Sequence, residues 1–272
     1  MNVPAIEDLN CRIKPLTPFG LEIHSRDPSS SLTAIAVDAL RPLVLQHRLL
    51  VLRGFQPIDE QTTFSKICSR WGQLLEWDFG TVFEVVEHAD PQNYLFTSGS
   101  VPYHWDGAFA SKTPWLQFFQ CRESPDATDV GQTIFCDTHA LWNSQSAATR
   151  ERWSSIEVEY TTDKVAHYGG HIRANLVDRH PHTEEIVLRF AEPPNSETTP
   201  LNTPEITIHG LIGQTVPEFL ADLRHQLYAA RFVYSHPWQV GDYVIADNHV
   251  LLHGRNRYHR QQPRRLWRVH IL

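Results

Sequence analysis

The chain has 272 residues, of which 41% are hydrophobic and 20% are charged, a composition typical of a soluble globular protein. The formal net charge is -7, and no run of basic residues is long enough to indicate a nucleic-acid partner. No apolar stretch approaches the roughly 18 residues that a membrane span needs. These features exclude a membrane or a nucleic acid as the expected partner and favour a small-molecule one.

The N-terminal residues and the cysteines of the chain give no sign of secretion. Residues 1–10 contain acidic side chains and lack the apolar core of a signal peptide. The four cysteines lie far apart without CxxC pairs, so a disulfide framework and a cysteine-ligated zinc site are both unexpected. These features favour a location in the cytoplasm. Because we find no linker, we expect one domain, residues 1–272.

The first part of the chain combines helices with one short strand. Residues 31–48 have apolar side chains at helical spacing, and Leu49–Leu52 reads as a short strand that Gly54 ends. A second helix is expected to follow, with Asp59 as its N-cap and Gly72 at its end.

From about residue 81 onward, short β-branched or aromatic segments alternate with turns, which is typical of strands. The expected strands are Thr81–Glu87, Tyr94–Ser98, Trp115–Cys121, Thr133–Cys136, Ile156–Tyr160, Glu185–Phe190, Glu205–Ile208, Arg231–Ser235, Tyr243–Ala246 and Leu266–Leu272. Helices are expected near Thr138–Arg152 and at Pro217–Ala230. This pattern predicts a mainly β protein with flanking helices, of the sandwich or jelly-roll kind.

Two stretches lack clear periodicity. Residues 161–184 contain several histidines and glycines, and residues 191–204 are rich in Pro, Ser, Thr and Asn. We interpret both as loops. Because a long loop in a compact domain often serves as a lid or a binding loop, residues 161–184 are the better candidate for such a role.

His104-Trp105-Asp106 is the strongest candidate for a metal site. In an extended segment, side chains two residues apart point to the same face, so His104 and Asp106 face together while Trp105 faces away. Two imidazoles and one carboxylate form the facial triad of non-haem Fe(II), which leaves positions open for a chelating cosubstrate and O2. The alternative is a buried histidine that is bonded to an aspartate for packing. A second copy of the pattern, His88-Ala89-Asp90, precedes a turn and is interpreted as surface.

The distant second imidazole is expected from His253, with His249 as a competitor in the same segment. Arg264 and Arg268 follow, and on a strand they would share a face. A guanidinium can clamp a carboxylate through two hydrogen bonds, so one arginine could hold a dicarboxylic cosubstrate and the other a substrate anion. Arg265 leaves the register open by one residue, and a solvated basic edge strand is the alternative.

Over nearly its whole length, the chain resembles the taurine dioxygenase (TauD/TfdA-like) family of Fe(II)/2-oxoglutarate oxygenases. The matching motifs follow the order of the family and are Leu49–Gln73, His104-x-Asp106, Gly131-Gln132-Thr133, His253 and Arg264. In the family the threonine motif is commonly Gly-Gly-Asp-Thr, from which this chain departs.

The resemblance implies a double-stranded β-helix (jelly-roll) core with Fe(II) bound by His104, Asp106 and His253. It implies 2-oxoglutarate and O2 as cosubstrates, with Thr133 and Arg264 on the C5 carboxylate of 2-oxoglutarate. Arg265 and Arg268 remain the alternatives for that role. Arg268 also matches the position that contacts the acidic group of the substrate in taurine dioxygenase.

Within the family, Ser98–Phe109 most resembles the oxygenases of isonitrile biosynthesis. Those enzymes desaturate tyrosine isonitrile to a vinyl isonitrile, in some members with loss of the carboxylate, and the resemblance implies the same reaction in secondary metabolism here. For the substrate carboxylate we expect Arg268 first and Arg173 or Lys112 second. The aromatic candidates for the pocket are Tyr103, Trp105, Phe109, Tyr168 and Trp267.

Other functions remain open at this point. Within the same class, the alternatives are a hydroxylase of a free amino acid and a taurine-type sulfonate dioxygenase. A zinc hydrolase would act without O2 and would leave Arg264 without a role, whereas a non-catalytic binding protein would hold no stoichiometric iron. The sequence also leaves open desaturation versus hydroxylation, the lid, and the oligomeric state, a homo-oligomer included.

Overall fold

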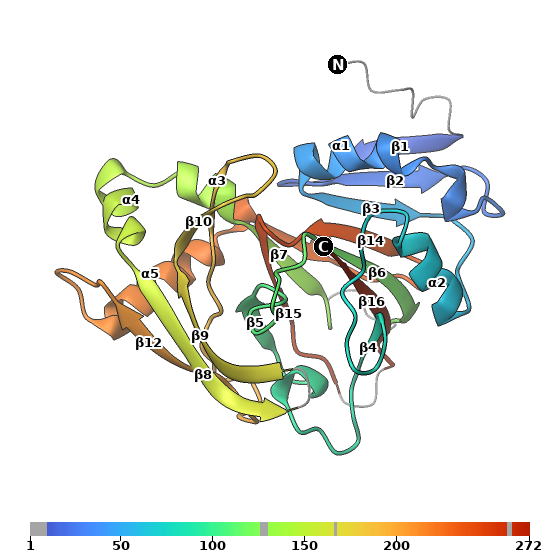
Figure 1. The fold of residues 1–272 in the computed structure, drawn as a ribbon. Coiled ribbons are helices and arrows are strands. Elements are labelled where there is room, and N and C mark those ends of the chain that lie inside the picture. Colours follow the sequence, from blue (N-terminus) through green and yellow to red (C-terminus); the bar gives the residue numbers. More distant parts are fainter. Residues whose placement is uncertain (1–9, 126–129, 166–167, 260–262) are drawn as a thin grey trace.

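The computed structural model describes residues 10–125, 130–165, 168–259 and 263–272. Two β-sheets lie at its centre (Figure 1). The larger sheet contains, in spatial order, β1 (Cys11–Pro15), β2 (Leu21–Ser25), β3 (Leu49–Arg53), β14 (Tyr243–Asp247), β6 (Leu116–Glu123), β16 (Arg265–Ile271) and β4 (Val82–Val86). The smaller sheet contains β13 (Val233–His236), β7 (Thr133–Asp137), β15 (Leu251–Arg255) and β5 (Val101–His104).

The two sheets share an apolar layer. Val244 of β14 belongs to one buried cluster with Phe135 of β7 and Leu251 of β15. Neighbouring strands pair antiparallel, apart from the parallel pair β2 and β3. Since side chains alternate along a strand, β3, β6 and β14 present every second residue to this layer.

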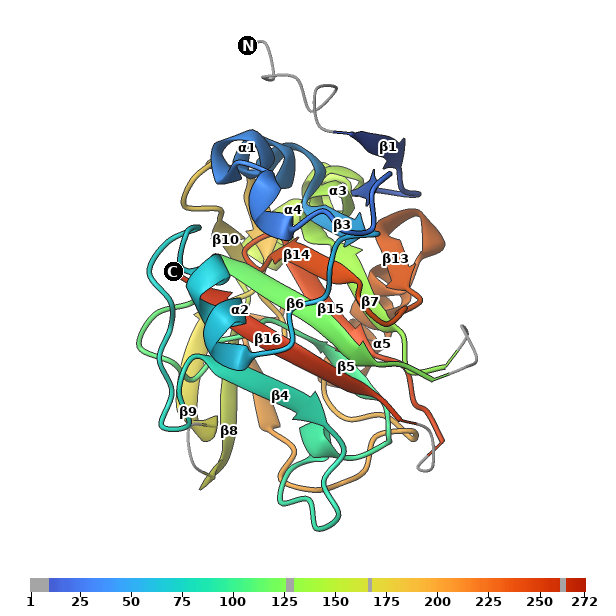
Figure 2. The ribbon, with the colours of Figure 1, turned by 90° about the vertical axis from the view of Figure 1, so that its right-hand side faces the viewer.

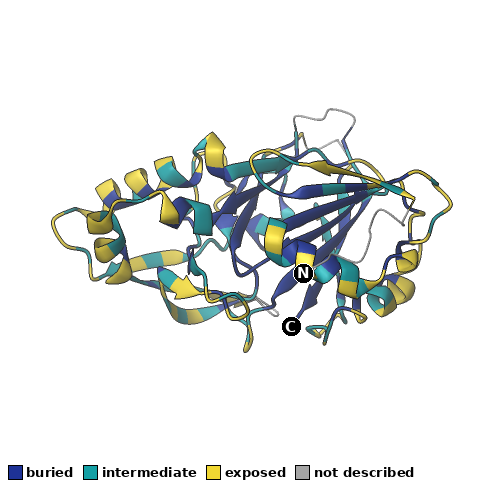
Figure 3. Ribbon diagram, turned by 90° about the horizontal axis from the view of Figure 1, so that it is seen from above, coloured by how far each residue is buried: buried dark blue, intermediate teal, exposed yellow. Residues whose placement is uncertain are grey.

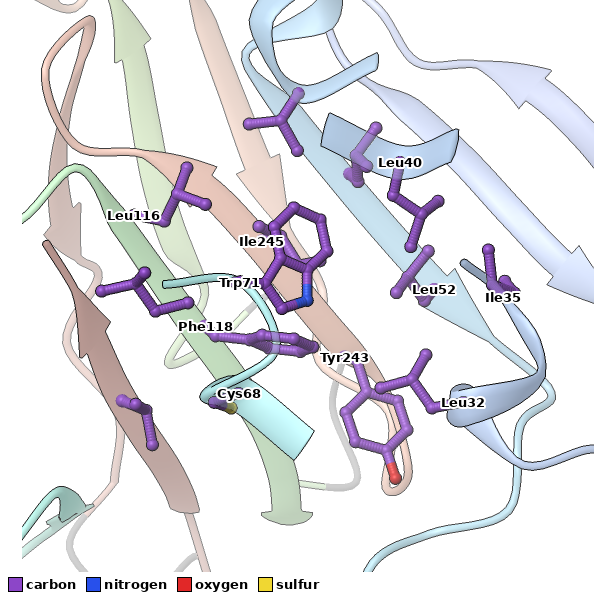
Figure 4. Packing of buried hydrophobic residues seen from close by; sticks show 14 of the residues in the cluster. Leu32, Ile35, Leu40, Leu52, Cys68, Trp71, Leu116, Phe118, Tyr243 and Ile245 are labelled. Atoms are coloured by element: carbon purple, nitrogen blue, oxygen red, sulfur yellow. The ribbon is translucent and has the colours of Figure 1, made fainter. Parts of the chain in front are cut away.

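The other face of the larger sheet is covered by α1 (Val37–His47) and α2 (Gln61–Cys68), with the 3-10 helix η2 (Leu32–Ala34). Figure 2 shows α2 lying across β6 and β16. Figure 4 shows the packing beneath these helices, where the ring of Phe118 meets Trp71 and Tyr243 edge-on, with centroids 6.0 and 6.3 Å apart. The helices therefore pack on one face of the larger sheet, and the smaller sheet lies on the opposite face.

A helical and strand-rich region flanks the smaller sheet. It comprises α3 (Thr138–Asn143), α4 (Ala147–Ser154), α5 (Val216–Leu227), η4 (Ala230–Phe232), the sheet of β12 (Glu205–His209), β8 (Glu157–Val165) and β9 (Tyr168–Asn175), and the pair β10 (Val177–Arg179) and β11 (Ile186–Leu188). Figure 3 shows that the central strands are buried, while exposed residues gather on the helices and loops around them.

Most expected elements have an observed counterpart. However, the helix expected over residues 31–48 begins only at Val37, α2 ends at Cys68 before Gly72, and β1, β2, β5 and β15 were not expected. Four further corrections follow. Tyr94–Phe96 is a 3-10 helix, η3, rather than a strand, because Asn93 caps it by accepting from the Leu95 N–H. Ser144 to Ser146 divide the expected helix near Thr138–Arg152 into α3 and α4.

The other two corrections concern a cap and a loop. Glu60, rather than Asp59, occupies the N-cap of α2, and its side chain makes no capping hydrogen bond. Residues 161–184 form much of β8, β9 and β10 in their described part, because ladder pairing supplies the order that local periodicity did not indicate. Residues 191–204 contain no helix or strand, as expected.

The molecule is therefore mainly β with few helices. Among the described residues, we find no helix with the length and apolar character that crossing a membrane requires.

Candidate active site

The three candidate iron ligands lie together at the paired strands β5 and β15. His104 ends β5 and stands opposite His253 in the register of the two strands, with ring centroids 4.2 Å apart. Asp106 follows β5 by two residues. One ligand atom from each of the three lies within 4.8 Å of the others. The smaller sheet thus unites residues separated by about half of the chain.

Both imidazoles are held in the neutral form that a metal requires. His104 donates from Nδ1 to the carbonyl of Pro102 at 2.9 Å, which leaves Nε2 for a metal. Burial lowers the pKa of His104. Burial, reinforced by the nearby His104, also lowers the pKa of His253 well below its ordinary value. A pair of neutral imidazoles beside a carboxylate fits Fe(II).

The carboxylate of Asp106 is oriented by donors on one oxygen. Its Oδ2 accepts from Gln117 Nε2 at 2.5 Å, from Arg268 Nη1 at 2.7 Å and from His270 Nε2 at 2.8 Å. Its Oδ1 lies 3.8 Å from Nε2 of His104. Burial alone would raise the pKa of Asp106, but Arg268 and the neighbouring histidines hold it well below the usual range. The ionised carboxylate therefore presents Oδ1 toward His104, while its Oδ2 lies 3.7 Å from Nε2 of His253.

Thr133 and Arg264 form a second polar group at this site. Arg264 donates from Nη2 to Oγ1 of Thr133 at 3.1 Å and from Nε to the carbonyl of Gly131 at 2.7 Å. Gly131 has a φ of +63°, and a Cβ there would lie 3.1 Å from Cδ of Arg264, so a glycine suits this close approach.

Arg264 is a buried cation without a buried counter-ion. It is 4% exposed, and it forms no ion pair with any carboxylate in the described ranges. Burial and the nearby Arg255 lower its pKa to about 9. A desolvated guanidinium is costly unless an anion pairs with it. The site therefore fits a ligand carboxylate, such as the distal one of 2-oxoglutarate.

Alternation along β16 separates Arg265 from Arg268, and Arg264 directly precedes the strand. Arg268 faces the site through its ion pair with Asp106, and its guanidinium lies 4.9 Å from the ring centroid of Phe83. Arg265 faces away and pairs with Glu123 at the edge of the sheet. The structure thus groups Arg264 with Thr133 and Arg268 with the candidate iron ligands, and it separates Arg265 from both.

A pocket of about 580 Å³ opens beside these residues. His104, Asp106, His253, Thr133, Arg264 and Arg268 all line it. One side, which we call the aromatic wall, consists of Trp77, Phe79, Phe83, His88 and Phe96. Within it, successive rings contact one another, with centroid distances from 4.2 Å (His88–Phe96) to 6.3 Å (Trp77–Phe79). The volume and lining suit a drug-sized aromatic ligand with one anionic group.

The structure distributes the expected aromatic residues unevenly. Trp105 and Phe109 line the pocket. Tyr103 does not: it alternates with His104 along β5, so its ring packs in the core, 4.7 Å from that of Tyr228. Trp267 likewise alternates with Arg268 and packs under α2 with Phe64. The side chain of Tyr168 lies outside the described residues.

The two alternative substrate cations lie elsewhere. Lys112 is exposed and does not line the pocket. Arg173 is on β9, where it pairs with Glu157 and Glu159 on the outside of the three-stranded sheet. Arg268 is therefore the expected substrate cation that the structure brings to the pocket.

His249 does not join the metal group. It bonds with Arg189, and its ring packs against His180, 5.3 Å away between centroids. His88, interpreted as surface, is exposed but also forms one end of the aromatic wall.

Sequence reasoning missed several residues that support the site. Gln117 and His270 bond to the Asp106 carboxylate, Asn248 bonds to its backbone, and Trp238 donates to Thr133. A usable signal existed for Gln117, since a polar residue within an apolar strand needs a buried partner. His270 shares the face of Arg268 by alternation along β16.

The comparisons with known proteins agree with this geometry. The family described as taurine catabolism dioxygenase TauD, TfdA family matches residues 12–270. The chain belongs to this family. It is a non-haem Fe(II)/2-oxoglutarate-dependent dioxygenase, with O2 as the second cosubstrate.

Among curated relatives, this dioxygenase is 45% identical to a 3-((Z)-2-isocyanoethenyl)-1H-indole synthase of Fischerella ambigua, over 96% of this chain and 95% of the relative. It is 34% identical to a tyrosine isonitrile desaturase of Pseudomonas aeruginosa, over 98% and 94% of the two chains. Among solved structures, PvcB of Pseudomonas aeruginosa superposes with a TM-score of 0.82 at 32% identity, covering 100% of this chain and 94% of PvcB. PvcB is described as an Fe, alpha-ketoglutarate dependent oxygenase from an isonitrile synthetic pathway.

Proposed function

We propose that this dioxygenase oxidises an isonitrile derived from an aromatic amino acid to an aryl vinyl isonitrile, in secondary metabolism. The observation that carries the proposal is the pocket, which combines the candidate iron ligands, one cation and the aromatic wall. The relatives support the aryl isonitrile class, since one is named for an indole and another for tyrosine isonitrile. The sequence pointed to the tyrosine-derived compound, whereas the 45% identical relative makes the indole compound the first to test.

In this proposal, His104, Asp106 and His253 hold the iron. The support is their mutual approach within 4.8 Å and the donors that orient Asp106. Fe(II), together with 2-oxoglutarate and O2, supplies a two-electron oxidant that removes hydrogen from a C–H bond. Thr133 and Arg264 then hold the distal carboxylate of 2-oxoglutarate, which matches the buried and unpaired charge of Arg264.

The protein itself orients the substrate. Arg268 would bind the substrate carboxylate next to Asp106, while the aryl group would lie against the aromatic wall. Phe83 links these two functions because the guanidinium of Arg268 lies over its ring. This placement would expose the carbon atoms between the ring and the isonitrile to the iron, and the buried surroundings keep bulk water away from them.

Further features of the whole protein belong to the same proposal. The two facing, largely antiparallel sheets support a double-stranded β-helix core, with residues 1–272 as one domain. We propose a cytoplasmic enzyme, in line with its free cysteines. A homo-oligomer is compatible with the proposal but not required, because each of the grouped site residues comes from one chain.

An anaerobic titration tests the iron chemistry and the substrate separately. Fe(II) and 2-oxoglutarate are added to the apoprotein, and the visible charge-transfer band of the chelate is recorded. The tryptophan-derived isonitrile acid is then added, and in parallel samples the tyrosine-derived one, free tryptophan and taurine. We expect the band to shift with an isonitrile and to be indifferent to tryptophan and taurine.

The outcomes separate the alternatives. A shift with free tryptophan or with taurine would favour the hydroxylase or the sulfonate dioxygenase. A band that no compound shifts would remove the isonitrile class, and no band with iron bound would remove the proposed cosubstrate site. After admission of O2, a product lacking two hydrogen atoms indicates desaturation, further loss of CO2 indicates decarboxylation, and an added oxygen indicates hydroxylation.

A further inference from the structure

The hydroxyl of Thr133 receives two hydrogen bonds from within the protein. Trp238 donates from its indole Nε1 to Thr133 Oγ1 at 2.9 Å, and Arg264 donates to the same atom at 3.1 Å. A hydroxyl group accepts through two lone pairs and donates one proton. Because both lone pairs are occupied, the Thr133 hydroxyl can form a third bond only as a donor.

The Thr133 hydroxyl proton lacks an acceptor within the described part of the protein. Thr133 is 4% exposed, and among the described residues its hydroxyl donates to no acceptor. Thr133 also lines the pocket. A buried donor that lacks a partner is costly, so an acceptor that enters the pocket would relieve this cost.

Trp238 is held firmly behind Thr133. It is 6% exposed, and its ring meets that of His236 edge-on, with centroids 4.4 Å apart. His236 is itself bonded to the buried Asp242, which pairs with Arg53. Trp238 does not line the pocket, so its effect on a ligand must pass through Thr133.

We propose that Trp238 is a positioning residue for the cosubstrate: its indole N–H makes the Thr133 hydroxyl a donor toward the distal carboxylate. This inference rests on the proposed role of Thr133 and Arg264. Thr133 and Arg264 then present donors only, so they favour a group that only accepts, which a carboxylate does. Chelators without a distal carboxylate gain nothing from Trp238.

The test compares two chelators on the Mn(II)-loaded enzyme by calorimetry. N-oxalylglycine carries the distal carboxylate, whereas oxalate has a chelating end alone. Trp238→Phe keeps an aromatic ring and removes the N–H donor. We expect it to weaken N-oxalylglycine about fivefold, as for the loss of one hydrogen bond, and to leave oxalate unchanged.

Three further variants sharpen the comparison. Thr133→Val should weaken N-oxalylglycine about tenfold, and adding Trp238→Phe to it should weaken binding no further. Thr133→Ser, which keeps the hydroxyl, should bind close to wild type. Trp115→Phe is the matched control, because Trp115 is also buried and donates its indole N–H to Asp247 instead; the ratio of the two affinities should not change.

The outcomes distinguish this inference from the proposed function. If Thr133→Val weakens N-oxalylglycine and Trp238→Phe does not, the role of Trp238 is overturned and that of Thr133 stands. Equal weakening of both chelators by Trp238→Phe would reduce Trp238 to a structural residue. If Thr133→Val has no effect, the proposed carboxylate site fails and the inference fails with it.

A spectroscopic measurement covers the case in which Trp238→Phe does not fold. The Zn(II)-loaded enzyme is labelled with 15N-tryptophan, and its indole N–H signals are recorded by NMR. The signal of Trp238 is assigned as the one whose position changes in Thr133→Ser. We expect this signal to shift with N-oxalylglycine and to remain in place with oxalate. A signal that responds identically to both chelators overturns the inference.

Discussion

The side chain of Asn248 brackets the backbone of Asp106. Its Oδ1 accepts from the Asp106 N–H at 2.9 Å, and its Nδ2 donates to the Asp106 carbonyl at 3.0 Å and to that of Pro114 at 2.9 Å. Asp106 lies beyond the last paired residue of β5, so no strand ladder holds it. Asn248 therefore fixes the turn that presents the carboxylate to the two histidines.

Replacing Asn248 by Ala should weaken iron binding. We expect a loss of affinity of about 10- to 100-fold, the range observed when a group that orients a metal ligand is removed. The free energy of unfolding should fall by about 2 kcal/mol because buried backbone groups lose their partners. Anaerobic Fe(II) titration and urea unfolding measure the two effects. Asn143→Ala, at an exposed position of α3, is the control. A wild-type affinity of Asn248→Ala for Fe(II) would contradict the role of Asn248 in holding Asp106.

Arg264 and Arg265 are neighbours in sequence, but only the loss of Arg264 is expected to affect 2-oxoglutarate. Arg264→Ala should raise the KM for 2-oxoglutarate by about two orders of magnitude, because it removes a buried charged partner of the carboxylate. Arg265→Ala removes an exposed ion pair with Glu123, which contributes little, and should leave that KM unchanged. Steady-state kinetics check both. Equal effects of the two variants would refute the assignment of the cosubstrate arginine.

The pair also predicts a difference in stability. Without cosubstrate, the buried charge of Arg264 is unpaired, so Arg264→Ala should cost the apoprotein little. When metal is already bound in all three proteins, added 2-oxoglutarate should raise the Tm of the wild type and of Arg265→Ala further, but not that of Arg264→Ala. A Tm rise of wild-type size in Arg264→Ala would show that another residue pairs with the ligand.

Arg268→Ala should separate substrate binding from cosubstrate consumption. It removes the proposed partner of the substrate carboxylate, so we expect the KM for the isonitrile acid to rise at least tenfold. Asp106 retains Gln117 and His270 as donors, so uncoupled turnover of 2-oxoglutarate should persist. Succinate formation is measured with and without substrate. Unchanged substrate kinetics would remove Arg268 from the substrate site.

His249 should make the folded protein sensitive to acid. Burial and the adjacent Arg189 lower its pKa to about 3. When the pH falls below the ordinary histidine pKa of about 6.5, His249 is protonated in the unfolded chain but stays neutral in the folded chain. The free energy of unfolding therefore decreases as the pH falls from about 6.5 to about 3.

The variant His249→Gln keeps an acceptor for Arg189 and cannot titrate. Relative to it, the wild type should lose about 1.4 kcal/mol of unfolding free energy per pH unit between pH 6 and pH 4. Urea unfolding in the presence of EDTA measures both proteins without metal. Parallel stability curves for the two would contradict the lowered pKa.

The parts of the site that sequence predicted share a local origin. His104 and Asp106 share a face through the period of an extended segment, and the same period separates Arg265 from Arg268. The order of the family motifs supplied His253 and Thr133. By contrast, Asn248, Gln117 and Trp238 act on residues more than ten positions away in the chain, and nothing local marks such partners.

The same division explains the corrections to the fold. Seven strands of the two central sheets were predicted, because each has an apolar face to bury: β3, β4, β6, β7, β13, β14 and β16. The strands β1, β2, β5 and β15 were not predicted. Tyr94–Ser98 has a strand-like composition, yet the Asn93 cap turns it into η3. Residues 161–184 show little periodicity, but β8, β9 and β10 order much of their described part through pairing with other segments. Local pattern determines an element only where no competing hydrogen bond is available.

By itself, the sequence indicated the class of chemistry, through the family resemblance and the candidate groups His104, Asp106, His253 and the late arginines. Only the tertiary structure decided which side chains meet. In the structure, Tyr103 and Trp267 lie in the core, and Arg173 lies on the outer surface. Phe83, by contrast, lines the pocket. The physical reason is that strand alternation sets the relative direction of neighbours, while sheet pairing between distant segments decides which direction faces the site.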